Sequence, residues 1–97
     1  MEPRLEWAEA KRLANLRKHG LDFADAHRVL NSRYRLDVAS VRQGETRVLS
    51  FSYVMDRLAV LTVVHTPRDG AVRVISFRPA SETESEHYHG WISGETD

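Results

Sequence analysis

The 97-residue sequence contains no cysteine, and this absence excludes several classes of protein. Without thiols the chain can form no disulfide scaffold, no cysteine-ligated zinc or iron–sulfur centre and no thiol nucleophile. Glycine and proline are scarce, with five and three residues. No glycine-rich phosphate loop and no Gly-x-Ser-x-Gly motif occurs. The candidate functional side chains are therefore histidines, arginines, lysines and carboxylates.

Long hydrophobic runs are also missing. The longest apolar stretch, Leu58 to Val64, is far shorter than the ~20 residues of a membrane-spanning helix, so we expect no membrane partner. Charged residues follow the N-terminus without an apolar signal region, which predicts a cytoplasmic protein. The content of 41% hydrophobic and 29% charged residues is typical of globular proteins, and the length predicts a single domain over residues 1–97.

The first third of the chain has helical periodicity. Residues 5–19 predict an amphipathic helix that ends at Gly20, which suits the left-handed conformation after a helix. Asp22 can cap a second helix, whose apolar side chains recur at helical spacing. These are Phe23, Ala26, Val29 and Leu30.

After residue 32 the pattern changes to the alternation typical of strands. Four strands are predicted, at residues 34–38, 47–54, 58–64 and 71–78. Ser81 and Glu84 form a capping box for a short helix that ends near Tyr88, and residues from about 89 to 97 are expected to be a flexible acidic tail. The predicted fold is α+β, with two N-terminal helices, an antiparallel sheet of about four strands and a short C-terminal helix.

The formal net charge of zero conceals an uneven distribution. Residues 1–80 hold all 14 Lys and Arg against nine acids, a net charge of +5, and residues 81–97 hold five acids and no Lys or Arg, a net charge of −5. A basic body with interleaved aromatic residues is suited to a polyanion such as a nucleic acid. A merely solvated surface is the alternative interpretation.

Two groups of side chains could contact phosphate. Lys11 and Lys18 share one side of the first helix, which is either a nucleic-acid contact or an ordinary solvated face. His65 ends the central strand, and Arg73 and Arg78 lie on the next one. A four-residue loop after His65 would direct His65 and Arg73 to opposite faces, whereas a three- or five-residue loop would bring them together.

The pair His87 and His89 does not predict a metal site. Residues two apart share a face of a strand but not of a helix, and no second cluster of ligands occurs in the sequence. We therefore predict neither a metal nor another cofactor.

Several spaced motifs resemble the BrnT family over about residues 5–88. They are Glu6-Trp7-Ala8-Glu9-Ala10-Lys11, Asn15-Leu16-Arg17-Lys18-His19-Gly20, Phe23-Ala24-Asp25-Ala26, Val63-Val64-His65-Thr66, Arg73-Val74-Ile75-Ser76-Phe77-Arg78 and Tyr88. The resemblance implies a RelE-like fold and a ribonuclease toxin of a bacterial type II toxin–antitoxin system. It also implies a cognate antitoxin of ribbon-helix-helix type, with operator DNA bound only through that antitoxin.

The resemblance gives the basic residues expected roles in metal-free RNA cleavage. Arg73 and Arg78 are expected to contact the phosphate and its transition state, and either His65 or His19 to transfer the proton. Lys11 and Lys18 are expected to contact the RNA backbone. Trp7 is expected either to stack on a base or to pack in the core.

The sequence departs from the family pattern in two places. Ala8 stands where the family usually has an Asp, which removes the cap of the first helix. The segment after the last strand, usually basic in the family, reads Pro79-Ala80-Ser81-Glu82-Thr83-Glu84-Ser85-Glu86-His87. An acidic helix beside the site would repel RNA, so a binding protein that has lost cleavage is the alternative to an active toxin.

Overall fold

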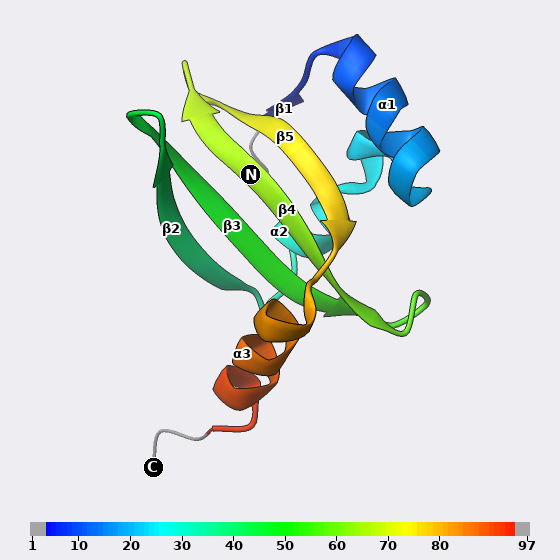
Figure 1. Cartoon of the computed structure of the whole chain (residues 1–97), viewed down its shortest axis with the longest axis vertical. Coiled ribbons are helices and arrows are strands. Elements are labelled where there is room, and N and C mark those ends of the chain that lie inside the picture. The colour runs from blue at the N-terminus through cyan, green and yellow to red at the C-terminus, as the bar shows by residue number, and fades with distance from the viewer. Residues whose placement is uncertain (1–3, 95–97) are drawn as a thin grey trace.

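The computed structural model describes residues 4–94 and shows a twisted five-stranded sheet with helices at its sides (Figure 1). The strand order is β1-β5-β4-β3-β2. In chain order the elements are β1 (Arg4–Glu6), α1 (Glu9–His19), the 3-10 helix η1 (Phe23–Asp25), α2 (His27–Leu30), β2 (Leu36–Arg42), β3 (Glu45–Val54), β4 (Ala59–Arg68), β5 (Ala71–Pro79) and α3 (Glu82–Ile92).

The predicted antiparallel sheet of about four strands is wrong. The sheet has a fifth strand, β1, which pairs in parallel with β5 and makes the sheet mixed. Residues 5–6 had been assigned to the first helix, but that helix begins only at Glu9. Three residues are too few to show the two-residue alternation of a strand, so the partner in β5, not the local sequence, determines their structure.

The helix ends follow the predicted signals, but the second helix is broken. Gly20 ends α1 with φ of +70°, and its N–H donates to the Leu16 carbonyl. The Asp22 carboxylate accepts the N–H of Ala24 at 2.9 Å, but only the 3-10 turn η1 follows it before the four-residue α2. At the other end of the chain, α3 continues past Tyr88 to Ile92, and residues 95–97 of the expected tail lie outside the described residues.

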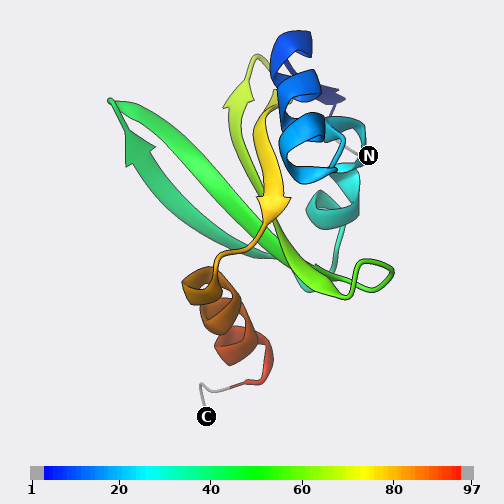
Figure 2. The same ribbon diagram turned by 45° about the vertical axis from the view of Figure 1, so that its right-hand side comes forward.

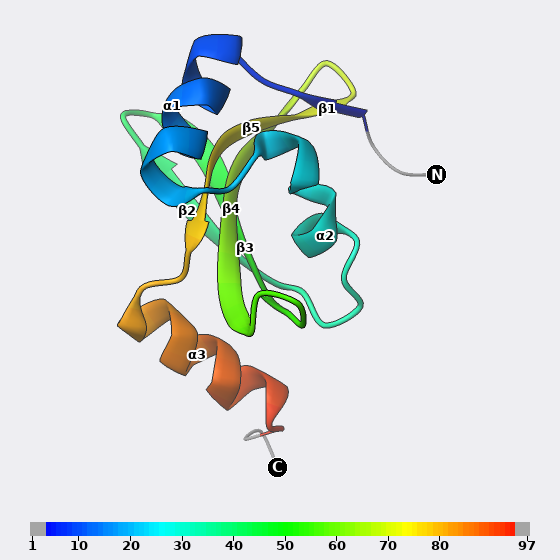
Figure 3. The same cartoon turned by 90° about the vertical axis from the view of Figure 1, so that its right-hand side faces the viewer.

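The two faces of the sheet have different surroundings. α1 contacts β5, α2 contacts β3 and β4, and the main core lies between these helices and the sheet (Figure 3). Its largest fully buried side chains are Phe23, Val29, Val63, Val74 and Phe77. Within residues 4–94 the opposite face is covered only at one end, by α3 (Figure 2). There Tyr88 packs on Phe51 and Val60. The rest of that face, here called the open face, remains available to a ligand.

A bulge in β5 sets which side chains reach each face. The register shifts between Val64 and His65, so Val64 pairs with Ser76, His65 pairs with Val74, and Ile75 between them has no partner in β4. The extra residue allows both Val74 and Phe77 to enter the core. The connection between β4 and β5 is the two-residue turn Asp69-Gly70, in which both residues have positive φ, as a type I′ turn requires.

Asn15 fastens α1 to the outer edge of β5. Its Nδ2 donates to the carbonyl oxygens of Phe77 at 2.7 Å and of Leu21 at 3.0 Å, and its Oδ1 accepts the Phe77 N–H at 3.2 Å. β1 pairs with β5 only at residues 71–73, so Phe77 lies beyond the reach of that strand. The buried Asn15 amide thus forms the hydrogen bonds that the N–H and the carbonyl of Phe77 cannot form with β1.

We expect the Asn15→Ala variant to lose about 2–4 kcal/mol of unfolding free energy, because the N–H and the carbonyl of Phe77 would be buried without partners. Urea denaturation followed by circular dichroism measures the change. The control is Asn31→Ala, which alters an exposed asparagine and should stay within about 0.5 kcal/mol of the parent. Equal stability of the two variants would contradict the role given to Asn15.

Candidate functional site

The centre of the open face carries a hollow of about 280 Å³ that is lined by three arginines. A separate hollow of about 310 Å³ lies at the end of the sheet that α3 covers. Arg42 comes from β2, Arg47 from β3 and Arg78 from β5. The other lining residues are Ser40, Leu49, Val64, Ile75 and Ser76. Three guanidinium groups around one concave surface have the charge and the donor geometry that suit a phosphate-rich ligand. We call this central hollow the arginine hollow.

The sequence analysis missed Arg42 and Arg47. In the β2–β3 register, Arg42 lies opposite Glu45, and Ser40 lies opposite Arg47. The alternation of the predicted strand 47–54 did place Arg47 on the same face as Leu49 and Phe51. Because β2 was predicted to end before Arg42, that residue was assigned to a turn and its common face with Arg47 was not recognised.

Arg78 is held by a carboxylate of α3. Its Nη1 donates to Glu84 Oε1 at 2.8 Å, and its Nη2 donates to Glu84 Oε2 at 3.0 Å. Glu84 is also the third residue of the capping box, and its Oε1 accepts the N–H of Ser81 at 2.8 Å. The hydrogen bonds from Arg78 are the main reason that the pKa of Glu84 falls to about 2, against the opposing effect of burial. The pair therefore remains ionised at neutral pH.

The pair with Glu84 leaves one edge of the Arg78 guanidinium available. The two carboxylate oxygens take the end of the group formed by Nη1 and Nη2. Nε–H has no partner among residues 4–94, and Nη2 carries a second hydrogen. Nε–H and this second hydrogen can together donate to two oxygens of one phosphate, so Arg78 can hold Glu84 and a phosphate simultaneously.

His19 lies near Arg78 at the end of α1. It follows Asn15 by four residues and so lies on the same side of the helix, one turn closer to the end of β5. Partial burial lowers the pKa of His19, and the positive charges of Lys18 and Arg78 lower it further. The neutral imidazole is therefore favoured at neutral pH, which is the form that accepts a proton.

The other predicted residues of the N-terminal segment are farther from a common site. Lys18 is exposed beside His19, whereas Lys11 lies two turns earlier on the same helix and is also exposed. Trp7 packs against the main core, with its ring in edge contact with Phe23 at a centroid distance of 6.3 Å. Its Nε1 donates to Glu9 at 3.3 Å. Of the two interpretations of Trp7, the structure thus supports packing in the core.

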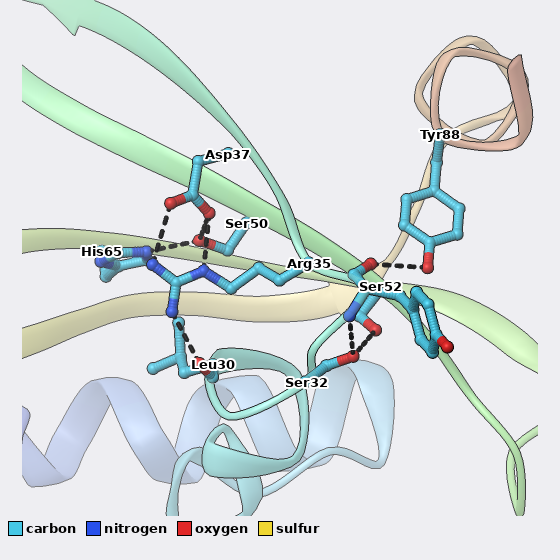
Figure 4. Close-up of polar contacts among 9 residues, drawn as sticks. Leu30, Ser32, Arg35, Asp37, Ser50, Ser52, His65 and Tyr88 are labelled. Carbon is cyan, nitrogen blue, oxygen red and sulfur yellow. Dashed lines mark hydrogen bonds and ion pairs between the residues drawn. The ribbon is translucent and has the colours of Figure 1, made fainter. Parts of the chain in front are cut away.

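His65 lies on the helix-covered face, away from the arginine hollow. It is 7% exposed and pairs with Val74, a core residue. Its Nε2 is 2.7 Å from Ser50 Oγ (Figure 4). The actual turn has two residues, and the bulge in β5 shifts the register, so none of the three loop lengths considered from the sequence applies.

His65 is the buried end of a chain of hydrogen bonds that reaches the surface at Arg35 and Asp37. Ser50 Oγ donates to Asp37 Oδ1 at 2.6 Å, so the serine has no second hydrogen and His65 Nε2–H is the donor in the contact between them. Arg35 donates to both oxygens of Asp37 at 2.8 Å, and its Nη1 donates to the Leu30 carbonyl at 2.6 Å (Figure 4). The network joins β2, β3 and β4 to the end of α2, which is a structural role.

Arg73 and Arg78 are not brought together. They are five residues apart on β5, a separation of roughly 15 Å along a strand. Arg73 pairs with Thr66 in the register, and its Nη1 is 3.4 Å from Glu6 Oε2 of β1. Of the predicted phosphate contacts, only Arg78 lines the arginine hollow.

Comparison with protein families identifies the chain. The sequence model of the ribonuclease toxin BrnT of type II toxin–antitoxin systems matches residues 7–84. The chain belongs to the BrnT family. The matched segment contains α1, all of the sheet except β1, and the Arg78–Glu84 pair. The family implies a ribonuclease toxin and an antitoxin partner.

The comparison with curated proteins finds no match. A separate observation concerns membranes: none of the helices within residues 4–94 is long and apolar enough to span one.

The burial of His65 predicts a pH dependence of stability. Burial is the main cause that lowers the pKa of His65 below its ordinary value near 6.5, and the charge of Arg35 adds to this, while Asp37 opposes it. The folded protein therefore binds the proton less readily than the unfolded chain, so stability is complete above about pH 6.5 and falls as the pH falls below that value.

We expect His65→Gln, whose amide can replace the Nε2–H donor, to remove this contribution. The unfolding free energy of the parent should fall more steeply between pH 6.5 and 5 than that of the variant, by up to about 1.4 kcal/mol per pH unit. The same measurement on His27→Gln, which alters an exposed histidine, is the control, since His19 is present in all three proteins. Parallel curves for parent and His65→Gln would contradict the assignment.

Proposed function

We propose that this BrnT-family protein is a metal-independent endoribonuclease that inhibits translation and is neutralised by its antitoxin. The arginine hollow carries the proposal, because it places three guanidinium groups on an uncovered sheet face with His19 near one of them. RNA is the polyanion that the family's activity requires, and its 2′-hydroxyl supplies the nucleophile. The reaction belongs to the bacterial cytoplasm, where RNA and the antitoxin are available.

The residues of the site have distinct tasks in this reaction. The Nε edge of Arg78 contacts the scissile phosphate and stabilises the charge that grows on its oxygens. Arg42 and Arg47 contact neighbouring phosphates of the same strand. Neutral His19 accepts the proton of the 2′-hydroxyl as that oxygen attacks phosphorus. Lys18, exposed beside His19, contacts the backbone at the edge of the site.

Charge supplied by arginine makes the proposed reaction independent of a metal ion. A guanidinium group is always protonated and offers donors spaced to match phosphate oxygens. Within this proposal, Arg78 supplies the electrostatic stabilisation and His19 moves the proton. No cofactor has a step in the proposed reaction.

The antitoxin is proposed to be a ribbon-helix-helix protein, and operator DNA is bound only through it. The antitoxin itself follows from the family. Because basic side chains of the toxin face RNA in this proposal, DNA recognition is left to the partner, and RNA and antitoxin are the two ligands of the toxin.

One observation favours a second candidate, a protein with the toxin fold that binds its antitoxin but does not cleave RNA. Glu84 already occupies one end of the Arg78 guanidinium, and a carboxylate there reduces the attraction for phosphate. The available Nε edge argues for the active enzyme. Purified protein incubated with RNA in EDTA distinguishes the two candidates, since only the first cleaves and only its cleavage is suppressed by antitoxin.

We expect Arg78→Ala to reduce the rate of RNA cleavage in EDTA by about 100- to 1,000-fold, the usual effect of removing one donor to a transition-state oxyanion. Single-turnover cleavage of labelled RNA measures the rate. Arg28→Ala is the matched control, because Arg28 is bound to Asp56 on the helix-covered side and should leave the rate within about twofold. Similar rates for the two variants would remove Arg78 from the reaction.

We expect the Arg42→Ala and Arg47→Ala variants to bind RNA more weakly than the parent, and we expect their affinity to depend less steeply on salt concentration. Each phosphate contact to a single strand contributes about 0.7 to the slope of log affinity against log salt concentration, and each variant should lose about that amount. Fluorescence anisotropy with single-stranded RNA, measured over a series of salt concentrations, gives the slope. An unchanged slope in both variants would place the RNA elsewhere.

A further inference from the structure

A histidine of α3 borders the open face next to the Arg78–Glu84 pair. His87 lines a second hollow of about 260 Å³ together with Glu84. Val38, Leu49, Phe51 and Thr83 complete the lining, and Leu49 also lines the arginine hollow. The two hollows therefore share Leu49 as a wall, and the ion pair links Arg78 of the arginine hollow to Glu84 of the second hollow.

The helix geometry directs His87 to this place. It follows Glu84 by three residues, so the two side chains are neighbours on one side of α3, with Cβ atoms about 5–6 Å apart. Tyr88 is buried between the helix and the sheet, 1% exposed, and its hydroxyl donates to the Tyr34 carbonyl at 2.8 Å. This anchor fixes the rotation of α3 and so keeps the exposed His87 at the edge of the hollow.

His19 and His87 reach the end of β5 from two different helices. α1 lies beside β5, and α3 follows β5 directly in the chain, so the end of β5 lies between the two helices (Figures 2 and 3). Arg78 is the second-last residue of this strand. Cleavage of RNA by its own 2′-hydroxyl requires two proton transfers, one from the attacking oxygen and one to the leaving oxygen. A single histidine near Arg78 accounts for only the first.

We propose that His87 is the general acid, which protonates the 5′-oxygen that leaves the scissile phosphate. This inference rests on the proposed ribonuclease activity and extends it by one catalytic residue. The family match ends at Glu84 and so assigns nothing to His87. The sequence analysis considered His87 only as a metal ligand, because the placement of α3 against β2 and β3 is not evident from the sequence.

The proton and bond changes balance with the two histidines in these roles. The 2′-oxygen forms a bond to phosphorus and gives its proton to neutral His19. The bond from phosphorus to the 5′-oxygen breaks, and that oxygen takes the proton of the His87 imidazolium. The products are a 2′,3′-cyclic phosphate and a 5′-hydroxyl, and proton exchange with water restores both histidines.

The test uses the full chain and two forms of one oligonucleotide. Each oligonucleotide is a 2′-deoxy strand that contains a single ribonucleotide. The bases on both sides of the cleavable bond are varied through all four across a set of such strands, so that cleavage preference does not decide the result. In the second form sulfur replaces the bridging 5′-oxygen. A thiolate leaves without protonation, so the sulfur substrate needs no general acid.

We expect His87→Gln to slow cleavage of the oxygen substrate by about 100-fold or more and to cleave the sulfur substrate within about tenfold of the parent. His19→Gln should be slow on both substrates, because attack by the 2′-hydroxyl still needs a base. His89→Gln is the matched control. His89 lies on the other side of Tyr88 and lines a different hollow, with Tyr53 and Ser85, so its removal should change neither rate.

Each other result overturns the inference. If His87→Gln cleaves the oxygen substrate at the parental rate, His87 transfers no proton. If it is equally slow on both substrates and melts at the parental temperature, its role is in binding and not as an acid. If the parent protein cleaves neither substrate in any RNA context, the proposed ribonuclease function fails, and the inference about His87 fails with it.

Discussion

The three hydrogen bonds of the Asn15 amide determine the position of α1 on the sheet, and the candidate site depends on that position. β5 is covered along its outer edge by β1 at only one end, so the N–H and the carbonyl of Phe77 need another partner. Asn15 supplies both and holds α1 against β5. Because His19 lies one turn after Asn15, the same contact holds an imidazole at the end of β5, where the charge of Arg78 lowers its pKa. The hydrogen bonds that satisfy the backbone of Phe77 therefore also determine where the His19 imidazole lies.

The acidic segment after β5 has a different meaning in the structure than in the sequence. Read as a charge run, it predicts repulsion of RNA. In the fold, Glu84 caps α3 through Ser81 and binds Arg78 with both oxygens, so its charge is balanced locally. The pair also limits the rotation of the guanidinium, which favours a fixed contact with phosphate. A carboxylate that is fully paired at 2.8 and 3.0 Å contributes much less repulsion than an unpaired one.

Local signals predicted much of the secondary structure. Gly20 after α1 and the capping box of Ser81 and Glu84 depend on neighbouring residues alone, and both were recognised from the sequence. The features that were missed depend on pairing between distant segments. The three residues of β1 become a strand only beside β5, and the bulge at Ile75 follows from the register of β4 with β5.

The strand register also explains why the sequence analysis did not group the residues of the candidate site. His65 follows an apolar strand and precedes a turn, which is equally consistent with a surface site and with a buried network. Its hydrogen bond to Ser50 and the link from Ser50 to Asp37 cross three strands and cannot be inferred from spacing. For the same reason Arg42 and Arg47 were overlooked, although the β2–β3 register directs both to the open face beside Arg78.

The basic segment of residues 1–80 and the acidic segment of residues 81–97 are in contact in the folded protein. Arg78 belongs to the basic first 80 residues and Glu84 to the acidic remainder, yet the two form an ion pair between β5 and α3 at 2.8 Å. Arg42 and Arg47 are the other two cations that line the hollow, and Arg47 Nε lies 3.1 Å from Glu45 Oε1. The local field at the hollow is therefore weaker than the net charge of the basic segment suggests. In the proposed function, recognition of RNA in the hollow depends on the fixed directions of a few donors more than on the total charge.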